Sequence, residues 1–139
     1  MDRWLTRQDN ESSYLVNGKI NSLAMMHFDL RPWGQKFAYY YGEWEKEYID
    51  LVRQLYRGGT FVDIGSSLGL YVICLGDLVR QAGDSIISIE PIAFNLEKQK
   101  KNVAINRLED VVDYYPVALG DHETTLCIDL PPSLVPARG

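Results

Sequence analysis

The second half of the chain alternates between short apolar runs and longer stretches with the spacing of helices. Residues 60–64 (TFVDI) form a nearly continuous apolar run, as expected for a strand buried on both faces, and residues 85–89 (SIISI) form another. Residues 68–82 and 91–106 are predicted to be helices, and residues 111–117 follow as a third strand. The order strand, helix, strand, helix, strand predicts a parallel sheet with right-handed crossovers, and therefore an α/β fold.

An amphipathic helix is predicted just before this series. Between residues 43 and 56, apolar side chains recur at the spacing of one helix face: Trp44, Tyr48, Leu51, Val52 and Leu55. Three glutamates lie in the first turns, where the helix dipole favours negative charge. Gly58 and Gly59 follow directly, and we expect them to end the helix.

The first 42 residues have a weaker pattern and are expected to form an N-terminal cap. Asn17-Gly18 stands between two short extended pieces, SYLV and INSLAMMHF, and this dipeptide is a recognised signal for a β-hairpin turn. Residues 31–42 are aromatic and punctuated by one proline and two glycines. We therefore expect a hairpin-containing cap at residues 1–42 and a sheet-forming portion at residues 43–139, which ends with a turn and one more strand in ALGDHETTLCIDL.

Composition and charge are those of one ordinary globular domain. Of the 139 residues, 46% are hydrophobic and 24% are charged, and the formal net charge is -5. Residues 1–59 hold eight basic and eight acidic residues, whereas residues 60–139 hold six basic and eleven acidic ones. A field of this sign repels phosphate backbones, so we do not expect nucleic acid as a partner.

The cysteines and the length of the apolar runs bear on where the protein works. Cys74 and Cys127 form neither a disulfide framework nor a metal-ligand spacing, so a reduced, cytoplasmic setting without a metal site is expected. No apolar run approaches the roughly 18 residues that a membrane-spanning helix needs. We therefore expect no membrane span.

The candidate site is the turn that follows the first strand of the sheet. In the stretch 61–71 (FVDIGSSLGLY), Asp63 lies near the strand end, Gly65 begins the turn and Gly69 falls in the first turn of the next helix. Ligands of open parallel sheets bind beyond the carboxyl ends of the strands, where this loop lies. Glu90 ends the neighbouring strand, and its carboxylate can accept hydrogen bonds from the two hydroxyls of a ribose. These residues favour a cofactor of the adenosine type.

The glycine spacing distinguishes two such cofactors. A dinucleotide fingerprint needs glycine at the middle position, where the backbone approaches a pyrophosphate, and this chain has Ser67 there. S-adenosylmethionine has no phosphate, and the carboxylate and ammonium of its amino-acid tail suit a looser Gly-x-x-x-Gly loop preceded by Asp63. The sequence therefore favours a methyl donor over a nicotinamide.

The stretch 61–71 resembles the first motif of class I S-adenosylmethionine-dependent methyltransferases, and in particular of the FkbM family. The family pattern is roughly Asp-Val-Gly-Ala-Asn-x-Gly-x-Tyr, and here it stands as Asp63-Ile-Gly65-Ser-Ser67-Leu-Gly69-Leu-Tyr71. The family also places a proline directly after its ribose-binding acid and asparagines twelve and sixteen residues beyond it. Here these are Glu90-Pro91, Asn102 and Asn106.

The resemblance covers roughly residues 40–128, and within it the chain departs from the family at several positions. Ser67 stands in place of the usual Asn, Ala93 in place of Pro and Gln99 in place of Leu. None of these changes removes a group that the cofactor must have. The change at Ser67 is expected to alter contacts with the methionine tail.

The resemblance implies a Rossmann-like open parallel sheet of the class I methyltransferase type and S-adenosylmethionine as cofactor. By this resemblance Glu90 would bind the ribose, Ile92 would pack on the adenine, and Ala118 or Leu119 would line the adenine edge. The acceptor would be a hydroxyl on a sugar or natural-product-like small molecule. No catalytic residue is assigned. The cofactor-binding residues expected in the loop are Asp63, Gly65, Ser66, Ser67 and Gly69.

The length leaves room for only part of such a sheet. Class I sheets have several further strands and helices after the third strand, whereas 22 residues follow Val117 here. We therefore expect the front half of the fold, with an open edge at residues 60–64 that invites self-association. Two functions stay open: a methyltransferase of which this is the cofactor-binding portion, and a non-catalytic module that acts through self-association or a partner. A NAD-dependent oxidoreductase is the third.

Overall fold

The computed structural model describes residues 14–125 and 127–129, which divide into two compact units between Trp44 and Glu45. Each unit is described by itself. Within the described part of the chain, no helix has the length and apolar character needed to cross a membrane.

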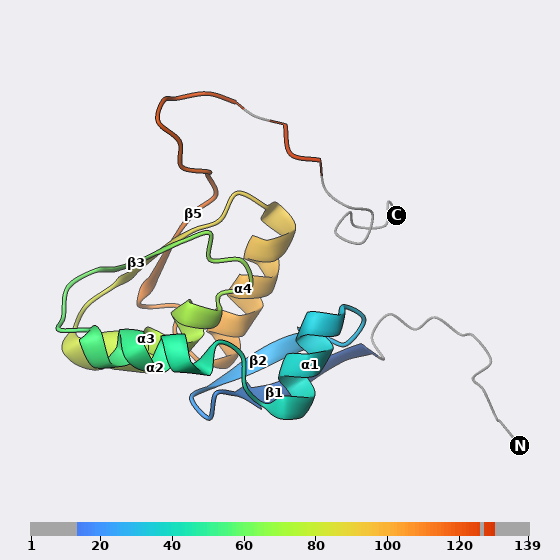
Figure 1. Cartoon of the computed structure of the whole chain (residues 1–139). Coiled ribbons are helices and arrows are strands. Elements are labelled where there is room, and N and C mark those ends of the chain that lie inside the picture. Colours follow the sequence, from blue (N-terminus) through green and yellow to red (C-terminus); the bar gives the residue numbers. More distant parts are fainter. Residues whose placement is uncertain (1–13, 126, 130–139) are drawn as a thin grey trace, which may run out of the picture. The chain divides into compact units, whose positions relative to one another are not determined.

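The first unit is a β-hairpin followed by one helix. Strands β1 (Leu15–Ile20) and β2 (Ala24–Asp29) pair in antiparallel fashion, and α1 (Trp33–Tyr41) comes next (Figure 1). The predicted hairpin is present, but the predicted turn at Asn17-Gly18 is wrong. These two residues lie inside β1, where they pair with His27 and Met26, and the turn is formed by residues 21–23.

A tertiary contact explains why the turn lies at Asn21 instead. Asn21 and Ser22 both have positive φ, 53° and 59°, the condition for a turn that matches the twist of a hairpin. The buried Asn21 side chain accepts a bond from the Trp44 N–H and donates one to the Trp44 carbonyl, both at 2.8 Å. Gly18 stays in the strand because the Tyr39 ring covers it: a Cβ there would lie 2.9 Å from that ring.

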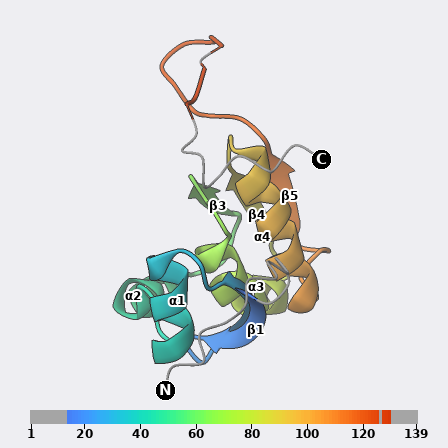
Figure 2. The same cartoon turned by 90° about the vertical axis from the view of Figure 1, so that its right-hand side faces the viewer.

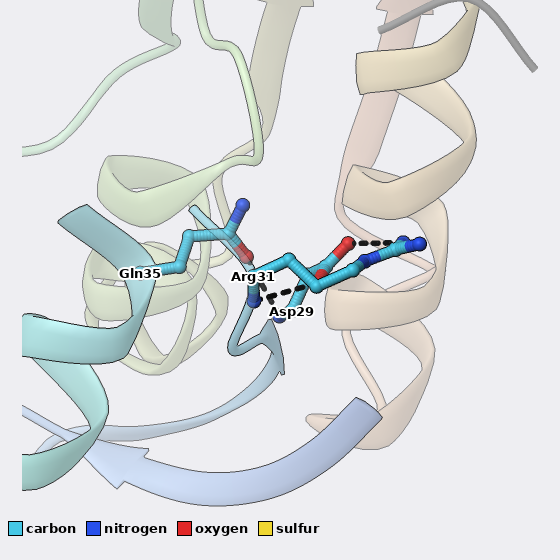
Figure 3. Close-up of polar contacts among 3 residues, drawn as sticks. All are labelled: Asp29, Arg31 and Gln35. Atoms are coloured by element: carbon cyan, nitrogen blue, oxygen red, sulfur yellow. Dashed lines mark hydrogen bonds and ion pairs between the residues drawn. The ribbon is translucent and has the colours of Figure 1, made fainter. Parts of the chain in front are cut away.

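The connection from β2 to α1 is built around the buried carboxylate of Asp29. Figure 3 shows Arg31 donating to both carboxylate oxygens, from Nε at 2.9 Å and from Nη2 at 2.6 Å, while the Asp29 N–H donates to Gln35 Oε1. The Arg31 N–H also donates to Asp29 Oδ1, which turns the chain toward the helix. A bidentate ion pair of this kind holds the Arg31 guanidinium and the Asp29 carboxylate in one relative orientation.

The sequence predicts an N-terminal hairpin/helix cap but assigns no helix to the residues of α1, because this stretch is aromatic and lacks an amphipathic period. The helix is stabilised by aromatic stacking along one side, with ring centroids 5.2 Å apart for Trp33 and Phe37 and 4.1 Å apart for Phe37 and Tyr41. It ends at Gly42, whose φ of 70° only glycine adopts readily.

The second unit has the predicted α/β order. Three short strands form a parallel sheet in the order β3-β4-β5, as the sequence predicts. The elements, shown in Figure 1, are α2 (Lys46–Leu55), β3 (Phe61–Ile64), α3 (Leu70–Ala82), β4 (Ile86–Ile89), α4 (Ala93–Ile105) and β5 (Val112–Tyr115).

Helices α3 and α4 pack on one face of the sheet, where the core of the unit lies, and α2 packs against α3 (Figure 2). The strands follow one another in chain order, so two crossovers of the same hand place α3 and α4 on the same side. On the other face Val62, Ile64 and Tyr115 are 47%, 62% and 49% exposed. The expectation that residues 60–64 are buried on both faces is therefore wrong in the described part of the chain.

The predicted open edge of the sheet is present among the described residues, whereas the predicted fourth strand is not. Among the described residues β3 pairs on one side only, with β4, so the predicted open edge is present. The strand predicted in ALGDHETTLCIDL is absent, since residues 118–125 and 127–129 form neither strand nor helix. Leu126 and Leu130 of that segment lie outside the described residues.

The first unit provides a test of the turn at Asn21. Replacing Asn21 by Ala removes both side-chain bonds to Trp44, and we expect the free energy of unfolding of this unit to fall by about 2 kcal/mol. All three tryptophans precede residue 45, so tryptophan fluorescence during urea unfolding reports on this unit. The control is Ser22→Ala, at a neighbouring exposed position with the same sign of φ. Equal effects of the two changes would contradict the assigned role.

Candidate functional site

The predicted loop lies at the carboxyl end of β3 and is held to the neighbouring strand by its own backbone. The N–H groups of Gly65 and Ser66 both donate to the Ile89 carbonyl of β4, at 2.8 and 3.1 Å. The Gly69 N–H donates to the Ser66 carbonyl at 2.7 Å and closes the turn before α3. Three residues of this short loop, Gly65, Ser67 and Gly69, have positive φ.

The two glycines of the loop have different tasks. A Cβ on Gly65 would meet no other atom within 4 Å, so this glycine is required only by its φ of 75°. A Cβ on Gly69 would lie 2.5 Å from Cγ of Gln99, in α4. Gly69 therefore lets the start of α3 approach α4, a contact that the sequence did not identify.

Buried polar side chains from three elements meet beneath the loop. Ser66 Oγ donates to Gln99 Oε1 at 3.1 Å, Gln99 Nε2 donates to Ser88 Oγ at 2.6 Å, and the two serine oxygens lie 2.7 Å apart. Farther along α4, Asn102 Nδ2 donates to the Leu68 carbonyl at 2.8 Å. The loop is thus anchored by side chains as well as by its backbone.

Glu90 connects the loop to the start of α4. Its carboxylate is almost fully buried, with the residue 4% exposed. Oε2 accepts a bond from the Ser67 N–H at 2.9 Å, and Oε1 accepts bonds from the Ile92 N–H at 2.9 Å and from Asn95 Nδ2 at 3.2 Å. A carboxylate has about four acceptor positions, so one remains, on Oε2.

Asp63 has a buried carboxylate oxygen at this site that accepts no hydrogen bond within the described chain. Its Oδ2 atom is buried and has no hydrogen-bond partner among the residues that the structure describes. Burial, together with the negative charges of Glu45 and Glu90, raises the pKa of Asp63 to about 6. A ligand that donates a hydrogen bond would pair the buried Oδ2 atom, and a ligand with positive charge would offset the repulsion from Glu45 and Glu90.

Glu45, which is hydrogen-bonded to Tyr71, adds a third carboxylate to the site beside Asp63 and Glu90. Glu45 precedes α2 and accepts a hydrogen bond from the Tyr71 hydroxyl, at 2.8 Å, from the first turn of α3. Burial and this bond raise the pKa of Tyr71 to about 12, so the phenol stays protonated and continues to donate. From the sequence, Glu45 was predicted only to lie in the first turns of a helix, because nothing local distinguishes it from the neighbouring glutamates.

The predicted site residues are therefore brought together in part. Asp63, the loop residues 65–69 and Glu90 are adjacent, and Ile92 lies half-buried at the start of α4. Ala118 and Leu119 are exposed in the irregular segment beyond β5. Sequence reasoning gave no role at the site to four residues that the structure places there. Tyr71 and Gln99 appeared only as positions of the family motif, and Glu45 and Ser88 were not singled out.

The charge and hydrogen bonding of the site select against phosphates. The amides of Gly65, Ser66, Ser67 and Gly69 already donate within the chain, whereas a phosphate loop needs such amides for its ligand. In the described part of the chain, no group of three or more His, Cys, Asp or Glu residues is placed to hold a metal ion. The arrangement suits an organic ligand with hydroxyl or ammonium donors.

No protein-family model matches the sequence, and a comparison with curated proteins gives no match either.

The role of Glu90 can be tested by removing its charge. In Glu90→Gln the amide nitrogen cannot accept from Ser67 or Ile92, so we expect the free energy of unfolding to fall by about 1–2 kcal/mol, net of the relieved repulsion with Asp63. Urea unfolding followed by circular dichroism measures the change. Glu97→Gln, the same substitution at an exposed position of α4, is the matched control. An effect no larger than that of the control would refute the connecting role.

The raised pKa of Asp63 predicts that the stability of the protein depends on pH. Because its pKa rises from 3.8 to about 6 on folding, the native state binds more protons in this window, and stability falls as the pH rises through it. Above about pH 7, where Asp63 is ionised in the native state as well, the penalty is complete, about 2–3 kcal/mol. We expect Asp63→Asn to stabilise the protein by about 2 kcal/mol at pH 8 and hardly at all at pH 4.

Urea unfolding at the two pH values measures this effect, with Asp113→Asn on exposed β5 as the control. A gain in stability that does not change between pH 4 and pH 8 would show that ionisation of Asp63 is not the cause.

Proposed function

We propose that the second unit binds S-adenosylmethionine at the β3–α3 loop and that the protein is a methyltransferase of Rossmann-like fold. The observation that carries the proposal is the buried, unpartnered Oδ2 of Asp63 beside two further acids. A carboxylate that destabilises the free protein at neutral pH is most simply explained by a ligand that pairs with it. The methyl donor carries both an ammonium and a sulfonium, and thus supplies the required charge.

The ammonium and the ribose of the donor each have a matching group in this proposal. Asp63 accepts from the ammonium, and the charge of Glu45 adds to the attraction for the cation. Glu90 accepts from one ribose hydroxyl through the remaining position on Oε2, which is one fewer than the sequence suggested. A second ribose bond would displace the Asn95 amide, the longest of the three contacts that Glu90 makes at present.

The reaction class follows from the donor and from the resemblance to the FkbM family. When bound, the donor supplies an electrophilic methyl group on sulfur. The protein's part is to align donor and acceptor and to exclude water. We propose a hydroxyl of a sugar or natural-product-like small molecule as acceptor and the cytoplasm as the setting, where free Cys74 and Cys127 stay reduced.

Two other functions are weighed by specific observations. A nicotinamide cofactor is disfavoured, since its pyrophosphate would meet Asp63 and Glu90 and find the amides of the loop already occupied. A non-catalytic cofactor-binding module that self-associates is favoured by the unpaired edge of β3 in the described sheet and by exposed Val62 and Ile64. This module is the second candidate.

Calorimetry distinguishes the cofactors. We expect the protein to bind S-adenosylmethionine at pH 8, to bind its demethylated product more weakly because the sulfonium charge is lost, and not to bind NAD. Asp63→Asn should weaken donor binding by about tenfold, roughly 1.4 kcal/mol, although it stabilises the fold. The control variant, Asp113→Asn, should bind as the wild type does. A folded wild-type protein that binds neither the donor nor its product would sink the proposal.

A further inference from the structure

Ser66, Ser88 and Gln99 form a closed ring of hydrogen bonds. Ser66 gives its proton to Gln99 Oε1, so the bond between the two serines must run from Ser88 to Ser66. Gln99 Nε2 then donates to Ser88 and completes the ring. Each hydroxyl donates once and accepts once, which is the arrangement in which neighbouring bonds strengthen one another. Ser88 and Gln99 are fully buried, and Ser66 is 6% exposed.

Each member of the ring comes from a different part of the unit. Ser66 lies in the loop, Ser88 in β4 and Gln99 in α4. Ser66 is also the residue whose carbonyl accepts from Gly69 and whose N–H donates to Ile89. The position of Ser66 therefore decides where the loop backbone lies on both sides of it.

Gln99 contributes a steric constraint besides its hydrogen bonds. A Cβ on residue 69 would lie only 2.5 Å from Cγ of Gln99 and 3.1 Å from its Nε2. The amide is thus confined between Gly69 and the two serines. A side chain so confined cannot change its rotamer without moving the loop.

We propose that Gln99 is a positioning residue of the loop, acting through this ring on Ser66 and so on the Ser67 amide that Glu90 binds. It touches no ligand in this role. Its effect on the methyl donor rests on the function proposed above, whereas its effect on the loop backbone does not.

Amide hydrogen exchange measures the loop directly. Gln99→Leu keeps nearly the same volume but leaves the Ser66 hydroxyl without its acceptor and Ser88 without its donor. We expect exchange in residues 65–69 to become about tenfold faster, the ratio that corresponds to the loss of one ordinary buried hydrogen bond. Exchange in the β1–β2 hairpin should stay unchanged. Gln81→Leu, at an exposed position of α3, is the matched control.

A triple variant separates positioning from general destabilisation. Replacing both serines by Ala together with Gln99→Leu leaves no polar group of the ring unpaired, so global stability should recover toward that of the wild type. The loop should nevertheless still exchange faster and bind the donor about tenfold more weakly, because no side-chain hydrogen bond then holds residue 66 and only its backbone bonds to Ile89 and Gly69 remain. If Gln99→Leu fails to fold, Ser88→Ala, which removes a smaller side chain from the ring, is compared with the wild type in its place.

The results decide whether Gln99 positions the loop or only contributes to the general stability of the unit. Unchanged exchange at residues 65–69 in Gln99→Leu, or protection of the loop that recovers fully with stability in the triple variant, would overturn the positioning role. Equal acceleration throughout the second unit would overturn it as well. If wild-type protein binds no S-adenosylmethionine, the proposed function fails, but the exchange measurement still decides whether Gln99 positions the loop.

Discussion

A closed ring of hydrogen bonds among three buried side chains holds the β3–α3 loop against β4 and α4. An unpaired hydroxyl or amide in an apolar interior costs about 1–3 kcal/mol, so Ser66, Ser88 and Gln99 can share that interior only where all are satisfied. This condition specifies one placement of the loop against β4 and α4. Gly69 supplies the steric half of the same constraint, because any side chain there would collide with Gln99.

The carboxylates of Glu90 and Asp63 lie in the same site but differ in their hydrogen bonding. Glu90 is bound by three donors and holds the loop to the start of α4, so its charge is part of the fold. Asp63 Oδ2 has no partner in the described chain, and its neighbours make ionisation harder. Such a division, in which one acid builds the site and another is kept available, is typical of places where a ligand is bound.

Local signals predicted the order of helices and paired strands in the second unit, apart from the strand expected after residue 117, but they misplaced the turn of the first unit. Gly83 ends α3 with a φ of 75°, as its position after an apolar period indicated, and the three strands pair in the expected parallel order. Asn17-Gly18 is an equally good local signal for a turn, but the bonds between Asn21 and Trp44 favour another. The stacked aromatic side chains of α1 likewise stabilise a helix whose residues show no amphipathic period in the sequence.

The candidate site shows the same division between sequence and tertiary structure. The sequence by itself placed Asp63, Gly65, Gly69 and Glu90 at one edge of a sheet, because strand ends and tight turns are set by neighbours a few residues away. Only the tertiary structure decided which of these acids is free to accept, and it added further side chains: Glu45, Tyr71, Ser88 and Gln99. Burial, charge and hydrogen-bond completeness depend on segments 20 to 30 or more residues apart, and no local pattern records them.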